Sequence, residues 1–254
     1  VGIAAGLSLC GKKVFAGTFA CFVTRRACDQ IAISLAYCKC DVKLIGIEGG
    51  FISGRNGATH QAVEDIAIMR SIPNMTVIVP ADATETKSVM EYLMNFSEPA
   101  YIRIQRKEIP VLFEESSYKF KLGQAEYLEQ GSDVTIIACG DMVKKTITAV
   151  DNLKSQGIDC QLLNMSSLKP IDKQAIIKSA QKTEAIVTVE NHNIYGGLGS
   201  AVTEITSENY PVPVIRVGIK DTFGEVGTGK YLEEKYDLGI KSIEKAVKQV
   251  LSRK

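Results

Sequence analysis

A chain of 254 residues with 45% hydrophobic and 23% charged residues has the composition of a globular protein, with room for one large or two ordinary domains. A formal net charge of +1 argues against a broadly basic surface for nucleic acid or an anionic membrane. No apolar run reaches the roughly 20 residues of a membrane span, and seven scattered cysteines, an odd number, indicate reduced thiols in a cytoplasmic protein.

The first part of the chain alternates helical and extended patterns. We expect helices at 1–9, 25–37, 63–70 and 85–94, and strands at 14–17, 42–47, 77–79 and 100–104. Around Pro110 the periodicity breaks in a mixed, charged segment, IPVLFEESSYKFKLG. We interpret this segment as a crossing between two domains, divided near residue 115.

The second part repeats the alternation. It predicts strands at 134–138, 160–164, 185–190 and 214–217, and helices at 141–155, 173–180, 198–207 and 242–251. Alternating strands and helices indicate parallel sheets with helices on both faces. The predicted fold class is therefore α/β, with two three-layer α/β/α domains, residues 1–114 and 115–254, built on mostly parallel sheets.

The stretch from Gly54 to Asp82 is the most informative part of the sequence. Gly54 and Gly57 bracket a polar turn, an amphipathic helix follows it, and the stretch ends in a buried strand. Functional groups of α/β proteins tend to lie on such loops between a strand and a helix. We therefore look for a site on this loop, at Arg55, Asn56, Thr59, His60 and Gln61.

The same residues carry a resemblance to a known family. GATHQ followed by RSIPNMTVIVPAD, Thr18-Phe19 with Phe22, and RACDQI resemble the pyrimidine-binding domain of the transketolase family, which uses thiamine diphosphate. PAYIRIQR, KPID and ENHNIYGGLGS continue the resemblance in order over nearly the whole chain. It is closest to the separately encoded C-terminal section of a split transketolase. The resemblance implies a pyrimidine-binding domain at 1–114, truncated at its N-terminus, and a transketolase C-terminal domain at 115–254.

Cofactor contacts follow from that resemblance. Phe19 and Phe22 match the two phenylalanines that contact the aminopyrimidine, and a flat heteroaromatic ring stacks well on such apolar faces. Arg25 stands where transketolases commonly have a third aromatic residue, so the rim of this pocket is altered. The family's catalytic glutamate is expected a few residues before Val1, outside this chain.

The diphosphate and its metal ion belong elsewhere in the family. A Gly-Asp-Gly run in an N-terminal domain holds them, and Gly140-Asp141-Met142 does not fit that pattern. We therefore expect Mg²⁺ or Ca²⁺ to be bound mainly by a partner section and assign no metal ligand here. The glycines at 196, 197 and 199 superficially resemble a phosphate-binding loop but lack the spacing of a dinucleotide fingerprint. His192 is interpreted as structural.

Substrate contacts are expected on the loop and near it. His60 is assigned hydrogen bonding or proton relay to substrate oxygens, and it is the one catalytic candidate within the chain. Arg106 resembles the arginine that grips a substrate phosphate. Three positions depart from typical transketolases: Arg55 and Asn56 replace a Glu-Asp pair, and Glu48 replaces a histidine. These changes suggest a non-standard sugar, or drift toward lost activity.

The main hypothesis is a transketolase-like transferase subunit. The resemblance implies transfer of a two-carbon ketol unit from a ketose to an aldose, with sugar phosphates as substrates, only together with an N-terminal diphosphate-binding section. A homodimer through this chain or an α2β2 assembly is expected. Two other enzymes remain open, a deoxyxylulose-phosphate-synthase-like transferase and the beta subunit of a 2-oxo-acid dehydrogenase. A non-catalytic scaffold partner is the hypothesis from another class.

Overall fold

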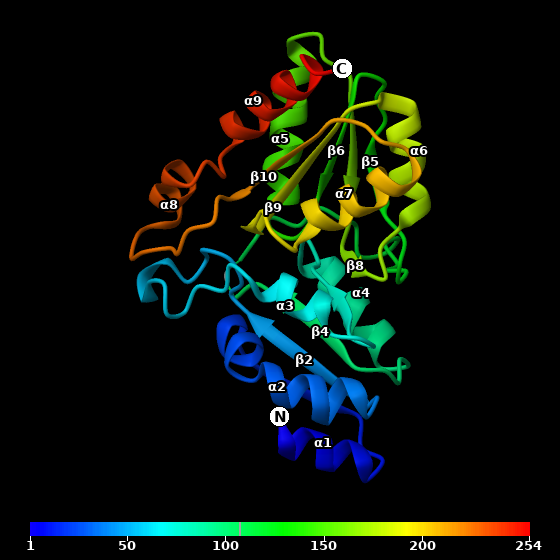
Figure 1. The fold of residues 1–254 in the computed structure, drawn as a ribbon, viewed down its shortest axis with the longest axis vertical. Coiled ribbons are helices and arrows are strands. Elements are labelled where there is room, and N and C mark those ends of the chain that lie inside the picture. The colour runs from blue at the N-terminus through cyan, green and yellow to red at the C-terminus, as the bar shows by residue number, and fades with distance from the viewer. Residues whose placement is uncertain (107) are drawn as a thin grey trace.

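The computed structural model, which describes residues 1–106 and 108–254, contains two five-stranded sheets (Figure 1). The first half of the chain forms most of the lower sheet, and the second half forms the whole of the upper one (Figure 1). The strand order is β1-β2-β4-β3-β8 in the first sheet and β10-β9-β6-β7-β5 in the second. Every pair is parallel except β3 with β8 and β5 with β7. The prediction of an α/β fold with mostly parallel sheets is confirmed.

Eleven elements make up the first half. In chain order they are α1 (Gly2–Leu9), β1 (Val14–Phe19), η1 (Phe22–Arg26), α2 (Cys28–Gln30), η2 (Ile31–Tyr37), β2 (Val42–Ile47), η3 (Gly54–Asn56), α3 (Asp65–Ser71), β3 (Thr76–Ile78), α4 (Ala83–Leu93) and β4 (Ala100–Ile104). The predicted helix at 25–37 is present, but it starts earlier and contains two π-helical segments, η1 and η2. The short 3₁₀ turn η3 was not predicted.

Eleven more elements make up the second half. They are β5 (Glu126–Glu129), β6 (Val134–Ala138), α5 (Met142–Ser155), β7 (Cys160–Asn164), β8 (Ser167–Lys169), α6 (Lys173–Thr183), β9 (Ile186–Asn193), α7 (Leu198–Asn209), β10 (Val214–Ile219), α8 (Gly229–Lys235) and α9 (Ile240–Leu251). The sequence did not predict β5, β8 or α8. Each has only three to seven residues, too few for a periodic pattern to stand out.

Strand β8 joins the two halves of the chain. It follows β7 directly in sequence, yet it pairs antiparallel with β3 of the first sheet, Val77 with Lys169 and Ile78 with Ser167. Lys169 also donates from Nζ to the carbonyls of Arg70, at 2.7 Å, and Ile72, at 2.6 Å, at the end of α3. The second half of the chain therefore completes the edge of the first sheet.

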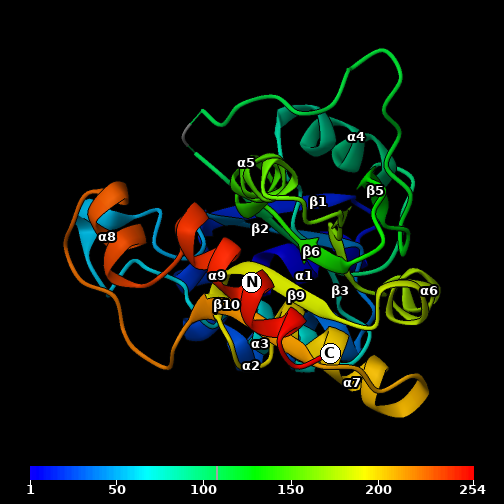
Figure 2. The same cartoon turned by 90° about the horizontal axis from the view of Figure 1, so that it is seen from above.

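Helices cover both faces of each sheet. In the first sheet, Ile78 and Ile102 pack against α4, whereas Leu44 and Val77 pack in the cluster that contains α1, η2 and α3. In the second sheet, one face packs against α5 and α9 and the other against α6 and α7. Figure 2 shows α8 away from these layers, beside the loop that follows β2. None of the described helices is long and apolar enough to cross a membrane.

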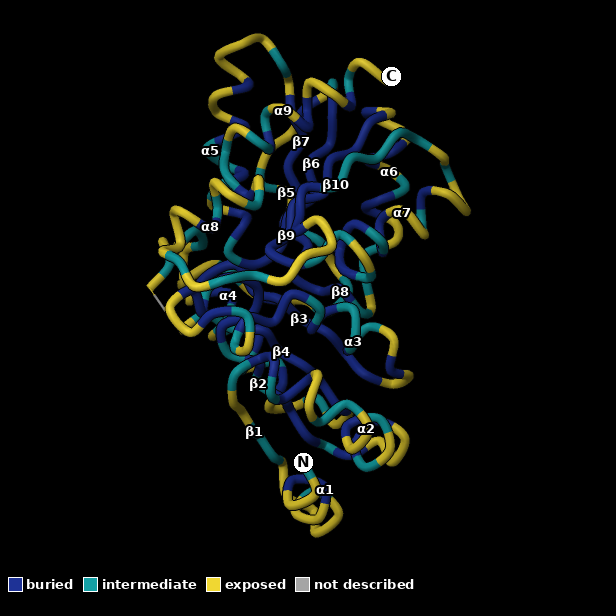
Figure 3. The backbone as a smooth tube through the Cα atoms, turned by 60° about the vertical axis from the view of Figure 1, so that its left-hand side comes forward, coloured by how far each residue is buried: buried dark blue, intermediate teal, exposed yellow. Residues whose placement is uncertain are grey.

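Burial follows this layering. The inner strands of both sheets are buried and the edge strands β1 and β5 are more exposed, while α1 lies at the lower end of the molecule with most of its surface exposed (Figure 3). One apolar cluster runs from α1 and η2 through the first sheet to α6 and α7 of the second. Since the two halves share this cluster and strand β8, they are packed as neighbours with a common core.

The segment between the halves is held by the start of α4. Asp82 caps α4 through an acceptor bond from the Glu85 amide (2.7 Å), and its second oxygen accepts from the amides of Leu112 (2.6 Å) and Phe113 (2.9 Å). Glu85 accepts from Tyr118 Oη at 2.5 Å. Two adjacent carboxylates thus fix the path of the crossing segment predicted around Pro110.

Candidate functional site

Four of the predicted substrate residues surround one cavity of about 460 Å³. Its lining comprises Glu48, Ile52, Ser53, Arg55, Asn56 and Arg106. Glu48 follows β2 directly and Arg106 lies two residues beyond β4. Because β2 and β4 are parallel neighbours, their carboxyl ends lie at the same edge of the sheet, where ligand sites of α/β proteins form. The loop after β2 then returns Arg55 and Asn56 to that edge.

Glu48 is held tightly at the base of this cavity. It is buried, it has a left-handed backbone (φ 58°), and its amide donates to the Ile104 carbonyl at 3.0 Å. Ser53 donates its hydroxyl to the Glu48 carboxylate. By contrast, Arg55, Asn56 and Arg106 are exposed and carry two positive charges at the cavity mouth. The cavity therefore combines a fixed acceptor with two guanidinium groups that can approach an anion.

The other predicted residues gather around an aromatic cluster. The His60 ring contacts both phenylalanines edge-on, with centroids 5.3 Å from Phe19 and 5.0 Å from Phe22. The two phenylalanine rings are themselves 5.7 Å apart. His60 Nδ1 lies 2.9 Å from the Thr59 hydroxyl. All three rings are half-buried, so part of each aromatic surface is left open to a flat ligand.

A hollow of about 350 Å³ adjoins this cluster. It is lined by Cys21, Phe22, Arg25, Arg26 and Thr59. Arg25 forms an ion pair with Glu64, Nε to Oε1 at 3.0 Å, and the Arg26 guanidinium lies 4.3 Å from the centre of the Phe22 ring. The side chain of Arg25 is therefore directed to Glu64, and Arg26 covers one face of Phe22. Burial raises the pKa of the Cys21 thiol, which keeps it protonated here although Arg25 opposes this.

The loop from Gly54 to Gln61 borders both hollows and packs on the second half of the chain. Gly227 donates to the Gly54 carbonyl at 3.0 Å, and the buried Gln61 donates from Nε2 to the Glu225 carbonyl at 2.9 Å. Figures 1 and 2 both show this loop beside α8. Gly57 has φ +70°, and a Cβ there would lie 2.9 Å from Val226. Gln61 thus helps to hold the loop, while Arg55 and Asn56 line the first cavity and His60 packs on the phenylalanine rings.

Sequence reasoning missed a buried charged group beneath the loop. Arg103 in β4 is 1% exposed and forms an ion pair with Asp65, Nε to Oδ2 at 3.1 Å. Tyr101 donates its hydroxyl to the same carboxylate at 2.6 Å. Burial alone would lower the pKa of Arg103, but Asp65 raises it, so the arginine stays charged. An arginine within the apolar strand AYIRI was the available signal, because a strand buried on both faces is normally apolar throughout.

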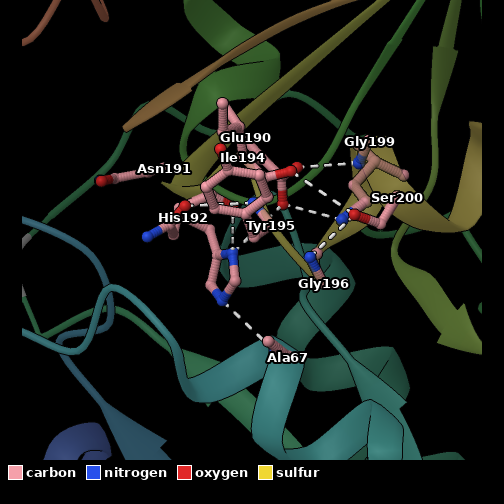
Figure 4. A network of polar contacts seen from close by, with 12 residues as sticks. Ala67, Glu190, Asn191, His192, Ile194, Tyr195, Gly196, Gly199 and Ser200 are labelled. Atoms are coloured by element: carbon pink, nitrogen blue, oxygen red, sulfur yellow. Dashed lines mark hydrogen bonds and ion pairs between the residues drawn. The ribbon is translucent and has the colours of Figure 1, made fainter. Parts of the chain in front are cut away.

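The glycine-rich segment at 196–199 is not open to a phosphate. Glu190 occupies the N-terminus of α7, where its carboxylate accepts from the amides of Leu198 and Gly199, both at 2.8 Å (Figure 4). His192 is fully buried; its Nδ1 lies 2.6 Å from the Asn193 carbonyl, and its Nε2 accepts from the Ala67 amide at 3.3 Å. Both ring nitrogens of His192 therefore have a backbone partner.

No group of three or more His, Cys, Asp or Glu side chains within residues 1–106 and 108–254 is arranged to hold a metal ion. All seven cysteines are free. The described residues therefore offer an aromatic cluster and a cavity lined by two arginines, but no assembled metal centre.

Comparisons with known proteins cover both halves of the chain. Residues 1–111 match the model of the transketolase pyrimidine-binding domain, and residues 123–243 match that of the transketolase C-terminal domain. A 6-deoxy-6-sulfo-D-fructose transketolase subunit from Clostridium sp. (strain MSTE9) is 43% identical over 100% of this chain and 79% of the relative. One of the subunits of an apulose-4-phosphate transketolase from Phocaeicola vulgatus is 44% identical over 87% of this chain and 70% of the relative.

A solved structure agrees with these relatives. It is described as a split-gene transketolase, an inactive beta4 tetramer, and it superposes with a TM-score of 0.93 at 44% sequence identity. The superposition covers 99% of this chain and 80% of that one. Similarity of this extent covers both sheets, including the strand and loop elements that border the two hollows.

Proposed function

We propose that this chain, which belongs to the transketolase family and corresponds to the C-terminal section of its split members, binds the aminopyrimidine of thiamine diphosphate and one end of a sugar substrate. The transketolase family implies this cofactor. When bound, thiamine diphosphate supplies an electron sink for breaking the carbon–carbon bond next to a carbonyl. The reaction we infer is transfer of a two-carbon ketol unit from a ketose to an aldose.

The aromatic cluster is the observation that supports cofactor binding. Phe22 lines a hollow and Phe19 packs edge-on against it, and both rings are half-buried, which suits contact with a flat heteroaromatic ring. His60 contacts both rings and keeps its Nδ1 beside the Thr59 hydroxyl, which orients the imidazole. We assign His60 to hydrogen bonding and proton transfer at substrate oxygens. Arg25 contributes the rim of this hollow.

The cavity at the edge of the first sheet suits a sugar that ends in a tetrahedral anion. Arg55 and Arg106 lie at its mouth and can form charge-assisted hydrogen bonds with phosphate or sulfonate oxygens. Asn56 can donate to and accept from sugar hydroxyls, and Glu48 with Ser53 offers a fixed acceptor at the base. The names of the two relatives specify a sulfo sugar and a sugar phosphate, both with such an anion. We therefore infer an anionic sugar as substrate.

The proposed enzyme also requires an N-terminal section and a second copy of this chain. From the family and from the relatives' description as subunits, we infer that an N-terminal section holds the diphosphate with Mg²⁺ or Ca²⁺. The 44% identical solved structure is a tetramer of one chain type, which supports self-association of this chain, as a homodimer or within an α2β2 enzyme. We place the domain boundary between residues 114 and 115 and the enzyme in the cytoplasm.

Calorimetric titration of thiamine diphosphate with Mg²⁺ tests the proposal, for this chain alone, for a candidate N-terminal section alone and for their mixture. Tight binding is expected in the mixture only. Phe22→Ala should weaken that binding roughly tenfold or more, since it removes the open aromatic face. Phe223→Ala is the matched control, because Phe223 is an exposed phenylalanine outside the site. Equal affinity in the mixtures made with wild type and with Phe22→Ala would contradict the assignment of the aromatic cluster.

The competing hypotheses predict different results in two assays, consumption of a 2-oxo acid and exchange of two-carbon units between sugars. A deoxyxylulose-phosphate-synthase-like transferase or a 2-oxo-acid dehydrogenase beta subunit would consume pyruvate or another 2-oxo acid. A ketol transferase would instead exchange two-carbon units between sugars and leave pyruvate untouched. A scaffold partner would show no cofactor binding in any mixture. His60→Ala compared in both assays identifies the reaction in which this chain takes part.

A further inference from the structure

The two ends of the loop that carries the candidate substrate residues are hydrogen-bonded to two buried polar residues, Arg103 and Asn191, which also bond to each other. Gly50 and Phe51 begin this loop, and Ala62 ends it. Gly50 donates to the Ala62 carbonyl at 2.7 Å, which closes the loop on itself. Glu48, Arg55, Asn56 and His60 all lie next to or within the closed segment. The residues that bond to the two ends of the loop therefore also determine the positions of these four side chains.

Arg103 holds the far end of the loop. Its Nη2 donates to the Ala62 carbonyl at 3.1 Å and also to the Asn191 carbonyl, in the second half of the chain, at 2.9 Å. Its Nε faces Asp65 at 3.1 Å. The guanidinium is thus shared by two backbone carbonyls from different halves of the molecule. Gly49 is required for this approach, because a Cβ there would lie 1.6 Å from Arg103 Nε.

Asn191 holds the near end. Its side-chain Oδ1 accepts from the Phe51 amide at 3.1 Å, and its Nδ2 donates to Asp141 Oδ2 at 3.0 Å. The Asp141 bond fixes which way the amide group points, so that the oxygen faces the loop. Asn191 is buried, and Gly50 has φ +67° with space only for hydrogen beside it. This contact spans 140 residues of sequence.

We propose that Asn191, oriented by Asp141 and supported by Arg103, is a positioning residue that sets the geometry of the substrate loop from the second half of the chain. The inference rests on the proposed function for its kinetic consequence, but the fastening of the loop does not depend on it. Neither Asn191 nor Arg103 lines the cavity around Glu48, Arg55 and Asn56. Loss of Asn191 should therefore weaken substrate binding without removing a substrate contact.

The first test is hydrogen exchange of this chain, with peptides that report residues 50–61. Asn191→Ala should speed exchange of the Phe51 amide and its neighbours roughly tenfold, as expected when a hydrogen bond worth about 1.4 kcal/mol is lost. Asn164→Ala is the matched control, because Asn164 is also a buried asparagine but donates to Glu85. Equal exchange of residues 50–61 in the two variants would overturn the proposal.

Two further variants separate orientation from packing. Asp141→Ala removes the acceptor for Asn191 Nδ2 and should loosen residues 50–61, whereas Asp141→Asn keeps an acceptor oxygen there and should not. Identical exchange in the two Asp141 variants would show that Asp141 does not orient Asn191. These variants leave Asn191 in place, so they remain informative if Asn191→Ala folds poorly.

The second test is steady-state ketol transfer by the mixture with the N-terminal section. A positioning role predicts a KM for the sugar several-fold higher in Asn191→Ala at nearly unchanged kcat, and a wild-type KM in Asn164→Ala. A purely structural defect would lower the active fraction, and with it kcat, at constant KM, which would overturn the kinetic part. If the wild-type mixture transfers no ketol unit, the proposed function has failed, and hydrogen exchange alone decides the role of Asn191.

Discussion

At the scale of single residues, the role proposed for Arg106 gives the most direct prediction about the substrate, namely that it carries an anionic group. It is an exposed arginine at the mouth of the cavity that Glu48 closes from below. Arg106→Ala should raise KM for a phosphorylated or sulfonated sugar roughly 10- to 100-fold, because a charge-assisted hydrogen bond contributes about 1.5–3 kcal/mol. Steady-state assays of the mixture with the N-terminal section measure this change.

Two controls define the meaning of that result. Arg253→Ala removes an exposed arginine at the far end of the chain and should leave KM unchanged. A sugar that lacks the anionic group should bind wild type and Arg106→Ala equally weakly. A loss of equal size for the anionic and the neutral sugar would contradict an anion contact by Arg106.

Glu85 is a second residue with a testable effect, a dependence of the free energy of unfolding on pH. Burial raises its pKa, and hydrogen bonds from Tyr118, the Ala81 amide and Asn164 only partly oppose this effect. Because the folded pKa lies above the unfolded value, folding favours the protonated carboxyl. The stability it contributes is fully present below the unfolded pKa of about 4.3 and is lost as pH rises through the raised folded pKa.

Glu85→Gln should remove this pH dependence. The amide stays neutral at every pH, and Asn164, whose Oδ1 is unpartnered, can turn to accept from it. Urea unfolding of wild type and variant between pH 4 and pH 8 should give free energies that separate in favour of the variant as pH rises. Glu129→Gln, at an exposed glutamate of β5, should run parallel to wild type. A constant difference across the range would show that Glu85 does not titrate there.

At the scale of elements, the start of α4 stabilises both its own helix and the crossing segment at Leu112 and Phe113. Asp82 accepts one capping bond and two bonds from the crossing segment, and it is fully buried. Asp82→Ala should lower the free energy of unfolding by roughly 2–4 kcal/mol, because a lost cap costs about 1 kcal/mol and unpaired buried amides cost more. Thr228→Ala, which removes only the cap of α8, should cost about 1 kcal/mol. Equal losses in urea unfolding would contradict a role for Asp82 in holding the segment.

At the scale of the whole molecule, one exposed apolar face has the pattern of an interface. Ile3 and Leu7 lie one turn apart on α1, and Ile33 and Tyr37 lie one turn apart on η2; Ile3 is 83% and Tyr37 79% exposed. The two helices contact each other, and Figure 3 shows α1 at one end of the molecule. Exposed apolar patches of this kind mark association sites in soluble proteins.

We expect this face to mediate the self-association proposed above, because its apolar side chains are exposed in the single chain. Leu7→Lys combined with Tyr37→Asp should reduce the mass measured by light scattering, since both place charge on the buried face of an interface. Met94→Lys, at an exposed apolar residue after α4, should leave the mass unchanged. A monomeric wild type, or an unchanged mass in the double variant, would contradict this interface.

The sequence by itself determined most of the local elements and supplied the candidate site residues, whose roles stay predictions. The strands at 42–47, 100–104, 134–138 and 160–164 are present at their predicted positions, because runs of buried apolar residues report burial of each segment independently of its partners. The loop at 54–61 was also identified from its glycines and polar residues, and the transketolase resemblance was confirmed.

Only the tertiary structure decided how distant segments meet. Strand β8 crosses to the first sheet, Arg106 joins Glu48 at one cavity, Glu190 fills the N-terminus of α7, and Asn191 holds a loop 140 residues away in sequence. None of these leaves a periodic signal, since each depends on one pair of groups brought together by packing. Hydrophobic periodicity encodes which residues are buried; the partners of buried polar groups are set by the assembled fold.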